Sequence, residues 1–164
     1  RIMYRYAFLL FLSLFLIGCE QASKRAGSID QAQQNMDIEK VKHLVEQSFQ
    51  GIWSDLDTNA IHEYHTEDFL LLENGMVWNN DTIANYLEKE RKEMEREQYQ
   101  RLNRFEFLRA KHRQTSVWLA YHNYGTWVKG ADTLGSAHWL ESVIAIKDGD
   151  EWKLEQMHST RIGK

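Results

Sequence analysis

Two residues near the end of the chain have the side chains needed for acid–base chemistry, Glu141 and His158. They lie on adjoining stretches, 136–147 and 151–161, in which apolar and polar residues alternate. Alternation with period two is typical of β-strands, and the turn residues around Gly149 favour a hairpin. In such a hairpin Glu141 is expected opposite or diagonal to His158, within reach of a cross-strand contact.

A carboxylate beside an imidazole raises the pKa of the imidazole and fixes its tautomer, which produces a usable acid or base. The same two side chains could equally form a buried pair that stabilises the sheet, because buried polar groups are usually paired. The sequence leaves both interpretations open. We therefore treat Glu141 and His158 as candidate catalytic residues.

The last strand starts with an apolar face and continues with a polar one. If Trp152 points inward, strict alternation also points Leu154, Gln156, His158 and Thr160 inward. An inward face that turns polar predicts a cavity at that end of the sheet. Aromatic and polar residues elsewhere are expected to line the same cavity, although the tryptophans could also belong to the core. The candidate ligand-binding residues are Trp53, Tyr64, Tyr121, Asn123, Trp139 and Gln156.

The sequence predicts neither a metal site nor a cofactor. His62 and His65 are three positions apart, whereas a zinc-binding helix places its histidines four apart. No glycine-rich loop that could hold a phosphate occurs in the chain. The 24 acidic and 20 basic residues leave a net charge of −4, which argues against nucleic acid as a partner.

The N-terminal segment has the order of an export signal. Two arginines precede the apolar run Ala7–Ile17, which is too short to span a bilayer as a helix. Leu-Ile-Gly-Cys follows, and Cys19 is the one cysteine in the chain. This segment resembles a bacterial lipoprotein signal, which implies lipidation of Cys19 and attachment to a membrane of the cell envelope. We divide the chain into a signal peptide (1–18), a flexible tether (19–36) and a domain (37–164).

Within the domain, helical periodicity comes first and strand alternation afterwards. Helices are expected from Asp37 to about residue 57, over a short segment after it, and from Asp81 to about residue 98, with both aspartates as N-caps. Two short strands joined at Asn74-Gly75 lie between the helices, and the long alternating runs begin near residue 99. This order predicts an α+β domain with helices on one face of a curved, mostly antiparallel sheet.

Several segments together resemble the nuclear transport factor 2-like superfamily, in its SnoaL-like, ketosteroid isomerase-like branch. They are FQGIWSDLD, YHTEDF, NGMVWN and HWLESVIAIKDGDEWKLEQMHST, in this order along residues 37–161. The resemblance implies a cone-shaped domain whose helices pack on the concave face of a strongly curved sheet and enclose a pocket. It also implies a homodimer. We expect the dimer to form through the opposite face of the sheet, which carries Trp118, Ala120, Leu140, Ile144, Ile146 and Met157.

Two functions are compatible with these observations. The first is a lipid-anchored envelope protein whose pocket binds a small, partly apolar molecule. The second is an enzyme of the isomerase, cyclase, dehydratase or hydrolase type that uses Glu141 and His158 as an acid–base pair.

Overall fold

The computed structural model describes residues 30–163. The predicted signal peptide, Cys19 and most of the predicted tether lie outside the described residues. Residues from Gln34 onward form one compact unit. All the strands of the described residues belong to it. Within the described residues no helix is both long and apolar enough to cross a membrane.

The helical part of the chain consists of α3 (Gln31–Ser48), the π-helical segment η1 (Phe49–Ser54), α4 (Thr58–Tyr64) and α5 (Asn80–Glu97). Two predicted boundaries are wrong. Helix α3 begins at Gln31, so the last residues assigned to the tether are helical. The N-cap of α5 is Asn79, whose side chain accepts a hydrogen bond from the backbone of Thr82, rather than Asp81.

Asp37 is buried inside α3 and does not cap it. Its carboxylate Oδ2 lies 3.1 Å from Nε2 of His112, and each of the two side chains is only 3% exposed. Because His112 belongs to β3, this pair connects the first helix to the sheet. The polarity of Asp37 therefore serves a buried tertiary contact.

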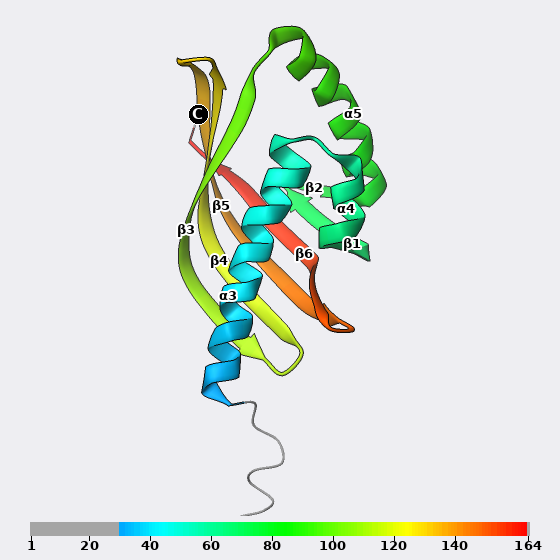
Figure 1. Ribbon diagram of the computed structural model, residues 1–164, viewed down its shortest axis with the longest axis vertical. Coiled ribbons are helices and arrows are strands. Elements are labelled where there is room, and N and C mark those ends of the chain that lie inside the picture. The colour runs from blue at the N-terminus through cyan, green and yellow to red at the C-terminus, as the bar shows by residue number, and fades with distance from the viewer. Residues whose placement is uncertain (1–29, 164) are drawn as a thin grey trace, which may run out of the picture. The chain divides into compact units, whose positions relative to one another are not determined.

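One six-stranded sheet forms the other layer (Figure 1). Its strands are β1 (His65–Glu73), β2 (Met76–Trp78), β3 (Gln100–Arg113), β4 (Ser116–Lys129), β5 (Asp132–Asp148) and β6 (Glu151–Ile162). They lie side by side in the order β2-β1-β6-β5-β4-β3, and only the β1–β6 pair is parallel. The long strands are curved, and the helices pack against one face of the sheet (Figure 1). The predicted α+β class is confirmed.

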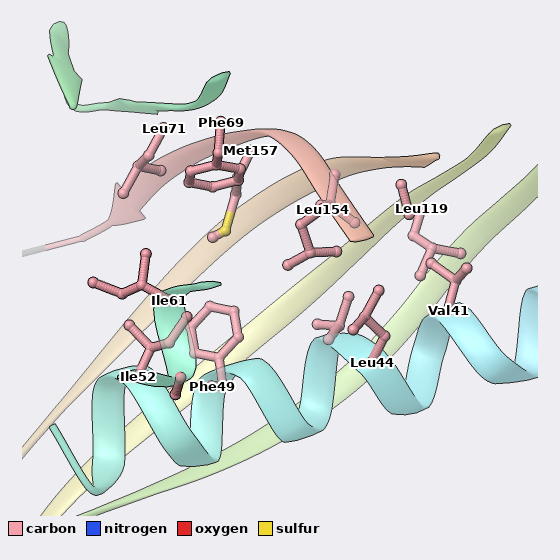
Figure 2. Packing of buried hydrophobic residues seen from close by; sticks show 14 of the residues in the cluster. Val41, Leu44, Phe49, Ile52, Ile61, Phe69, Leu71, Leu119, Leu154 and Met157 are labelled. Carbon is pink, nitrogen blue, oxygen red and sulfur yellow. The ribbon is translucent and has the colours of Figure 1, made fainter. Parts of the chain in front are cut away.

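The hydrophobic core fills the space between the helices and this inner face. Helix α3 contributes Val41 and Leu44, which face Leu119 and Leu154 of the sheet (Figure 2). Farther along, Phe49 and Ile52 of η1 pack with Ile61 of α4 and with Phe69, Leu71 and Met157 (Figure 2). Burying apolar surface of this extent is the main stabilising contribution to the fold.

Strand β6 contains a β-bulge that strict alternation does not predict. Leu154 pairs with Ala145 and Gln156 pairs with Ile144, so Glu155 has no partner on β5. One extra residue in a strand moves every following side chain to the other face. Beyond Glu155 the buried residues of β6 are therefore Met157 and Ser159.

The predicted inward positions of Gln156, His158 and Thr160 are thus wrong. His158 and Thr160 are exposed and Gln156 is half-buried, all three on the outer face of the sheet. For the same reason Met157, predicted to lie on the outer face, is in the core. The other residues of the predicted dimer surface do lie on the outer face, where Leu140 is exposed. The dimer itself stays a prediction.

Candidate functional site

A cavity of about 250 Å³ lies at the end of the inner face where the bulge redirects β6. Aromatic and polar side chains both contribute to its lining. Exposed Met76 and Tyr86 mark its opening to solvent, because both line the cavity and both have accessible side chains. The lining residues are Phe49, Trp53, Leu71, Glu73, Asn74, Met76, Trp78, Tyr86, Arg101, Trp139, Glu141, Met157 and Ser159.

Glu141 is the buried acid of this cavity, with 5% of its surface exposed. Its cross-strand partner is Ser159, whose Oγ donates a hydrogen bond of 3.0 Å to Oε1. The second oxygen, Oε2, is buried without a hydrogen-bond partner among the described residues. Burial raises the pKa of Glu141 to about 7, although Ser159 and the charge of Arg101 act in the opposite direction. This carboxyl group is therefore close to half-protonated at neutral pH.

A second carboxyl group, Glu73 of β1, lies on the other side of Ser159. Glu73 pairs with Ser159 in the parallel ladder, as Glu141 pairs with it in the antiparallel ladder. Burial raises the pKa of Glu73 as well, and the charge of Glu73 contributes to the raised pKa of Glu141. Two carboxyl groups of weakened acidity thus share one corner of the cavity.

Arg101 of β3 supplies the positive charge of the cavity. Its Nε donates a hydrogen bond of 3.1 Å to Oδ1 of Asn103. Its guanidinium lies 5.1 Å from the ring centre of Trp139 and 5.5 Å from that of Trp127, within the range of cation–π attraction. Burial lowers the pKa of Arg101, and the nearby charge of Glu141 raises it again. The group stays cationic because arginine is not deprotonated in proteins at ordinary pH.

The structure brings together some of the predicted site residues. Trp53, Trp139 and Glu141 line the cavity. Tyr121 and Asn123 point to the same side of the sheet but are fully buried and do not line the cavity. Both still influence the site: the nearby side-chain amide of Asn123 lowers the pKa of Glu141, and Glu141 contributes to the raised pKa of Tyr121.

Three predicted site residues lie elsewhere. Tyr64 packs against the core and does not line the cavity. Gln156 and His158 lie on the outer face, so the proposed Glu141–His158 pair does not exist. The carboxylate of Glu141 is hydrogen-bonded to the hydroxyl of Ser159 and not to the imidazole of His158.

Sequence reasoning missed Arg101, Glu73 and Ser159. A signal was available for Arg101, because alternation along β3 places it on the same face as Asn103, Phe105 and Phe107. A cation that shares a face with two phenylalanines is unusual enough to mark a site. No such signal marked Ser159, whose position depends on the bulge.

Among residues 30–163, no three histidine, cysteine or acidic side chains converge where they could hold a metal ion. The outer face carries one histidine pair, in which Nε2 of His138 lies 2.8 Å from Nδ1 of His122. These two rings lie on the opposite side of the sheet from the cavity. The polar side chains that line the cavity are two carboxyl groups, one serine, one arginine, the amide of Asn74 and the phenol of Tyr86.

The arrangement of elements matches solved structures of one fold. An NTF2-like protein with a cystatin-like fold from Novosphingobium aromaticivorans aligns with a TM-score of 0.65 at 12% identity, covering 83% of this chain and 92% of that protein. The chain has the nuclear transport factor 2-like fold.

Two further solved structures align over most of the described chain. ActVI-ORFA from Streptomyces coelicolor aligns with a TM-score of 0.63 at 17% identity, over 77% of this chain and 95% of that one. A ketosteroid isomerase-like protein from Erwinia carotovora atroseptica aligns with a TM-score of 0.58 at 15% identity, over 79% of this chain and 99% of that one. No family model and no curated protein matches the sequence. At these identities the similarity shows the fold, and one fold accommodates many functions.

Proposed function

We propose that this protein binds a small, partly apolar molecule in the cavity between η1, α5 and the inner face of the sheet. The observation that carries the proposal is the lining of the cavity. Five aromatic side chains converge on it together with a buried acid, Glu141, and a largely buried cation, Arg101. Ligand sites are typically apolar concavities with a few convergent polar groups. A volume of about 250 Å³ restricts the occupant to a small molecule.

Trp139 provides the direct test of this proposal. Native mass spectrometry of the purified domain is expected to show a bound small molecule in the wild type. Trp139→Ala is expected to weaken binding about fivefold or more and so to reduce that occupancy, since losing one aromatic contact with a ligand costs on the order of 1–3 kcal/mol. Trp118→Ala is the matched control, because Trp118 lies on the neighbouring strand but on the outer face. Equal occupancy in the two variants would place the ligand outside the cavity.

A second candidate function is proton transfer by Glu141. It is favoured by the burial that raises the pKa of this carboxyl group to about 7, which suits an acid or base working near neutral pH. The enzyme classes remain those expected from the sequence: isomerase, cyclase, dehydratase or hydrolase. The imidazole of His158 takes no part in this proton transfer, because it lies on the other face of the sheet.

We also propose that the protein is held at the bacterial cell envelope by lipid on Cys19. The support is the segment order Ala7–Ile17 followed by Leu-Ile-Gly-Cys. Cys19→Ala is expected to leave an unprocessed precursor or to release the protein from membranes, measured by fractionation and by intact mass. Ser23→Ala, four residues farther along, is the control and is expected to remain processed and membrane-bound. A Cys19→Ala protein that is still processed and membrane-bound would contradict the proposal.

A further inference from the structure

Arg101 is a largely buried cation that the fold itself does not neutralise. Among the described residues no carboxylate oxygen lies within 4 Å of its guanidinium, although Glu73 and Glu141 line the same cavity. Removing a charge from water is costly, and buried charges are normally paired. A largely buried guanidinium that lines a cavity without such a partner is well placed to receive one from a ligand.

The guanidinium is held in position from two directions. Its Nε is bonded to Asn103, and Nδ2 of Asn103 donates a hydrogen bond of 2.8 Å to Oγ of Ser54 in η1. The rings of Trp127 and Trp139 lie beside it. This leaves the two terminal NH₂ groups without a hydrogen-bond partner among the described residues. A paired set of coplanar N–H donors matches the two oxygens of a carboxylate.

At mildly acidic pH Glu141, whose pKa is raised to about 7, is largely protonated and does not neutralise that positive charge. Burial raises the pKa of both Glu73 and Glu141, so both carboxyl groups hold their protons to higher pH than exposed ones. A protonated Glu141 could also donate a hydrogen bond, and its Oε2 has no partner among the described residues. Both features suit a ligand that brings acceptor oxygens.

We propose that Arg101 recognises an anion, and that the ligand of the cavity is a small monocarboxylate with an apolar or aromatic body. The carboxylate accepts two hydrogen bonds from the terminal nitrogens of Arg101, while the body packs among Phe49, Trp53 and Trp139. This inference rests on the proposed function and adds the chemical class of the ligand. An ammonium ligand is disfavoured, because the guanidinium already lies beside the ring of Trp139.

Two probes of nearly equal shape separate charge recognition from apolar binding. Isothermal titration calorimetry at about pH 6 would compare 2-naphthoate with 2-acetonaphthone, its uncharged methyl ketone counterpart. The wild type is expected to bind the carboxylate about tenfold or more tightly than the ketone, as a charge-assisted hydrogen-bond pair would provide. Arg101→Met is expected to abolish this preference and leave the affinity for the ketone nearly unchanged.

Two further variants complete the design. Arg101→Lys keeps the positive charge but lacks the planar pair of N–H donors of a guanidinium. It is expected to retain part of the preference for the carboxylate over the ketone. Arg104→Met removes an exposed arginine from the outer face of the same strand, where it lies over Tyr124, and is expected to change nothing.

The possible failures are distinguishable. Equal binding of the two probes to the wild type, or an equal loss of both in Arg101→Met with an unchanged ratio, would overturn anion recognition while leaving the binding pocket intact. Binding of neither probe to the wild type would overturn the proposed function and this inference with it.

Discussion

Replacing Glu141 by glutamine is expected to stabilise the protein at pH 8 by about 3 kcal/mol and to have little effect at pH 4. Burial raises the pKa of this carboxyl group from 4.5 to about 7 in the folded protein, and each pKa unit corresponds to about 1.4 kcal/mol. The unfolded chain releases the proton near pH 4.5, whereas the folded chain holds it to about pH 7. The stabilising contribution of the raised pKa is therefore present below pH 4.5 and is lost as the pH rises to 7.

The measurement is chemical denaturation of Glu141→Gln and wild type at several pH values between 4 and 8. Another buried group titrates in this range, because burial lowers the pKa of His65 to about 4, which makes both proteins less stable as the pH falls below 6.5. The difference between variant and wild type cancels that effect. Glu151→Gln removes an exposed carboxylate on β6 and is the control, because surface substitutions usually change the free energy of unfolding by less than about 0.5 kcal/mol.

The sign of this difference separates two roles for Glu141. If the carboxylate served the fold, its removal would destabilise the protein at pH 8. If the fold tolerates the carboxylate at a cost, its removal stabilises the protein, as is common for residues retained for function. A loss of stability in Glu141→Gln at pH 8 would withdraw Glu141 as a functional candidate.

His112→Ala is expected to cost about 3 kcal/mol of folding free energy, at the upper end of what removing one partner of a buried hydrogen bond costs. The variant removes the imidazole that contacts the buried carboxylate of Asp37, and it also removes the edge-to-face contact with Trp152, at 6.1 Å between ring centres. Urea denaturation at pH 7 measures the loss.

His43→Ala serves as the control for this prediction. His43 lies on α3, as Asp37 does, but its side chain is exposed and lies 3.7 Å from the exposed carboxylate of Glu46. Exposed pairs of this kind contribute less than about 1 kcal/mol. If His112→Ala cost no more than His43→Ala, the Asp37–His112 contact would contribute nothing to holding α3 on the sheet.

Much of the fold follows from local patterns in the sequence. The apolar spacing of Val41, Val45 and Ile52 predicted the first helical segment, and alternation predicted the facing of β4 and β5. Val117, Leu119, Tyr121, Glu141 and Val143 all point inward as expected. These predictions hold because a helical stripe or an uninterrupted strand repeats a fixed geometry over neighbouring residues.

Some boundaries depended on distant partners instead. Asp37 looks like an N-cap in sequence because aspartate favours that position. In the structure it lies in the middle of a helix, since His112, 75 residues later, provides a hydrogen-bond partner inside the protein. Local preference was overridden by a tertiary contact.

The composition of the site was decided by tertiary structure. Glu155 is the residue that strand β6 inserts between Leu154 and Gln156, and nothing in KLEQMHS marks a bulge. Its position depends on the registers that β1 and β5 impose on the two sides of β6. That single insertion replaced His158 by Ser159 beside Glu141, because side-chain facing in a strand has period two. The sequence alone thus determined that an acid-bearing cavity forms on the inner face, whereas strand pairing determined that Ser159, Glu73 and Arg101 surround the acid.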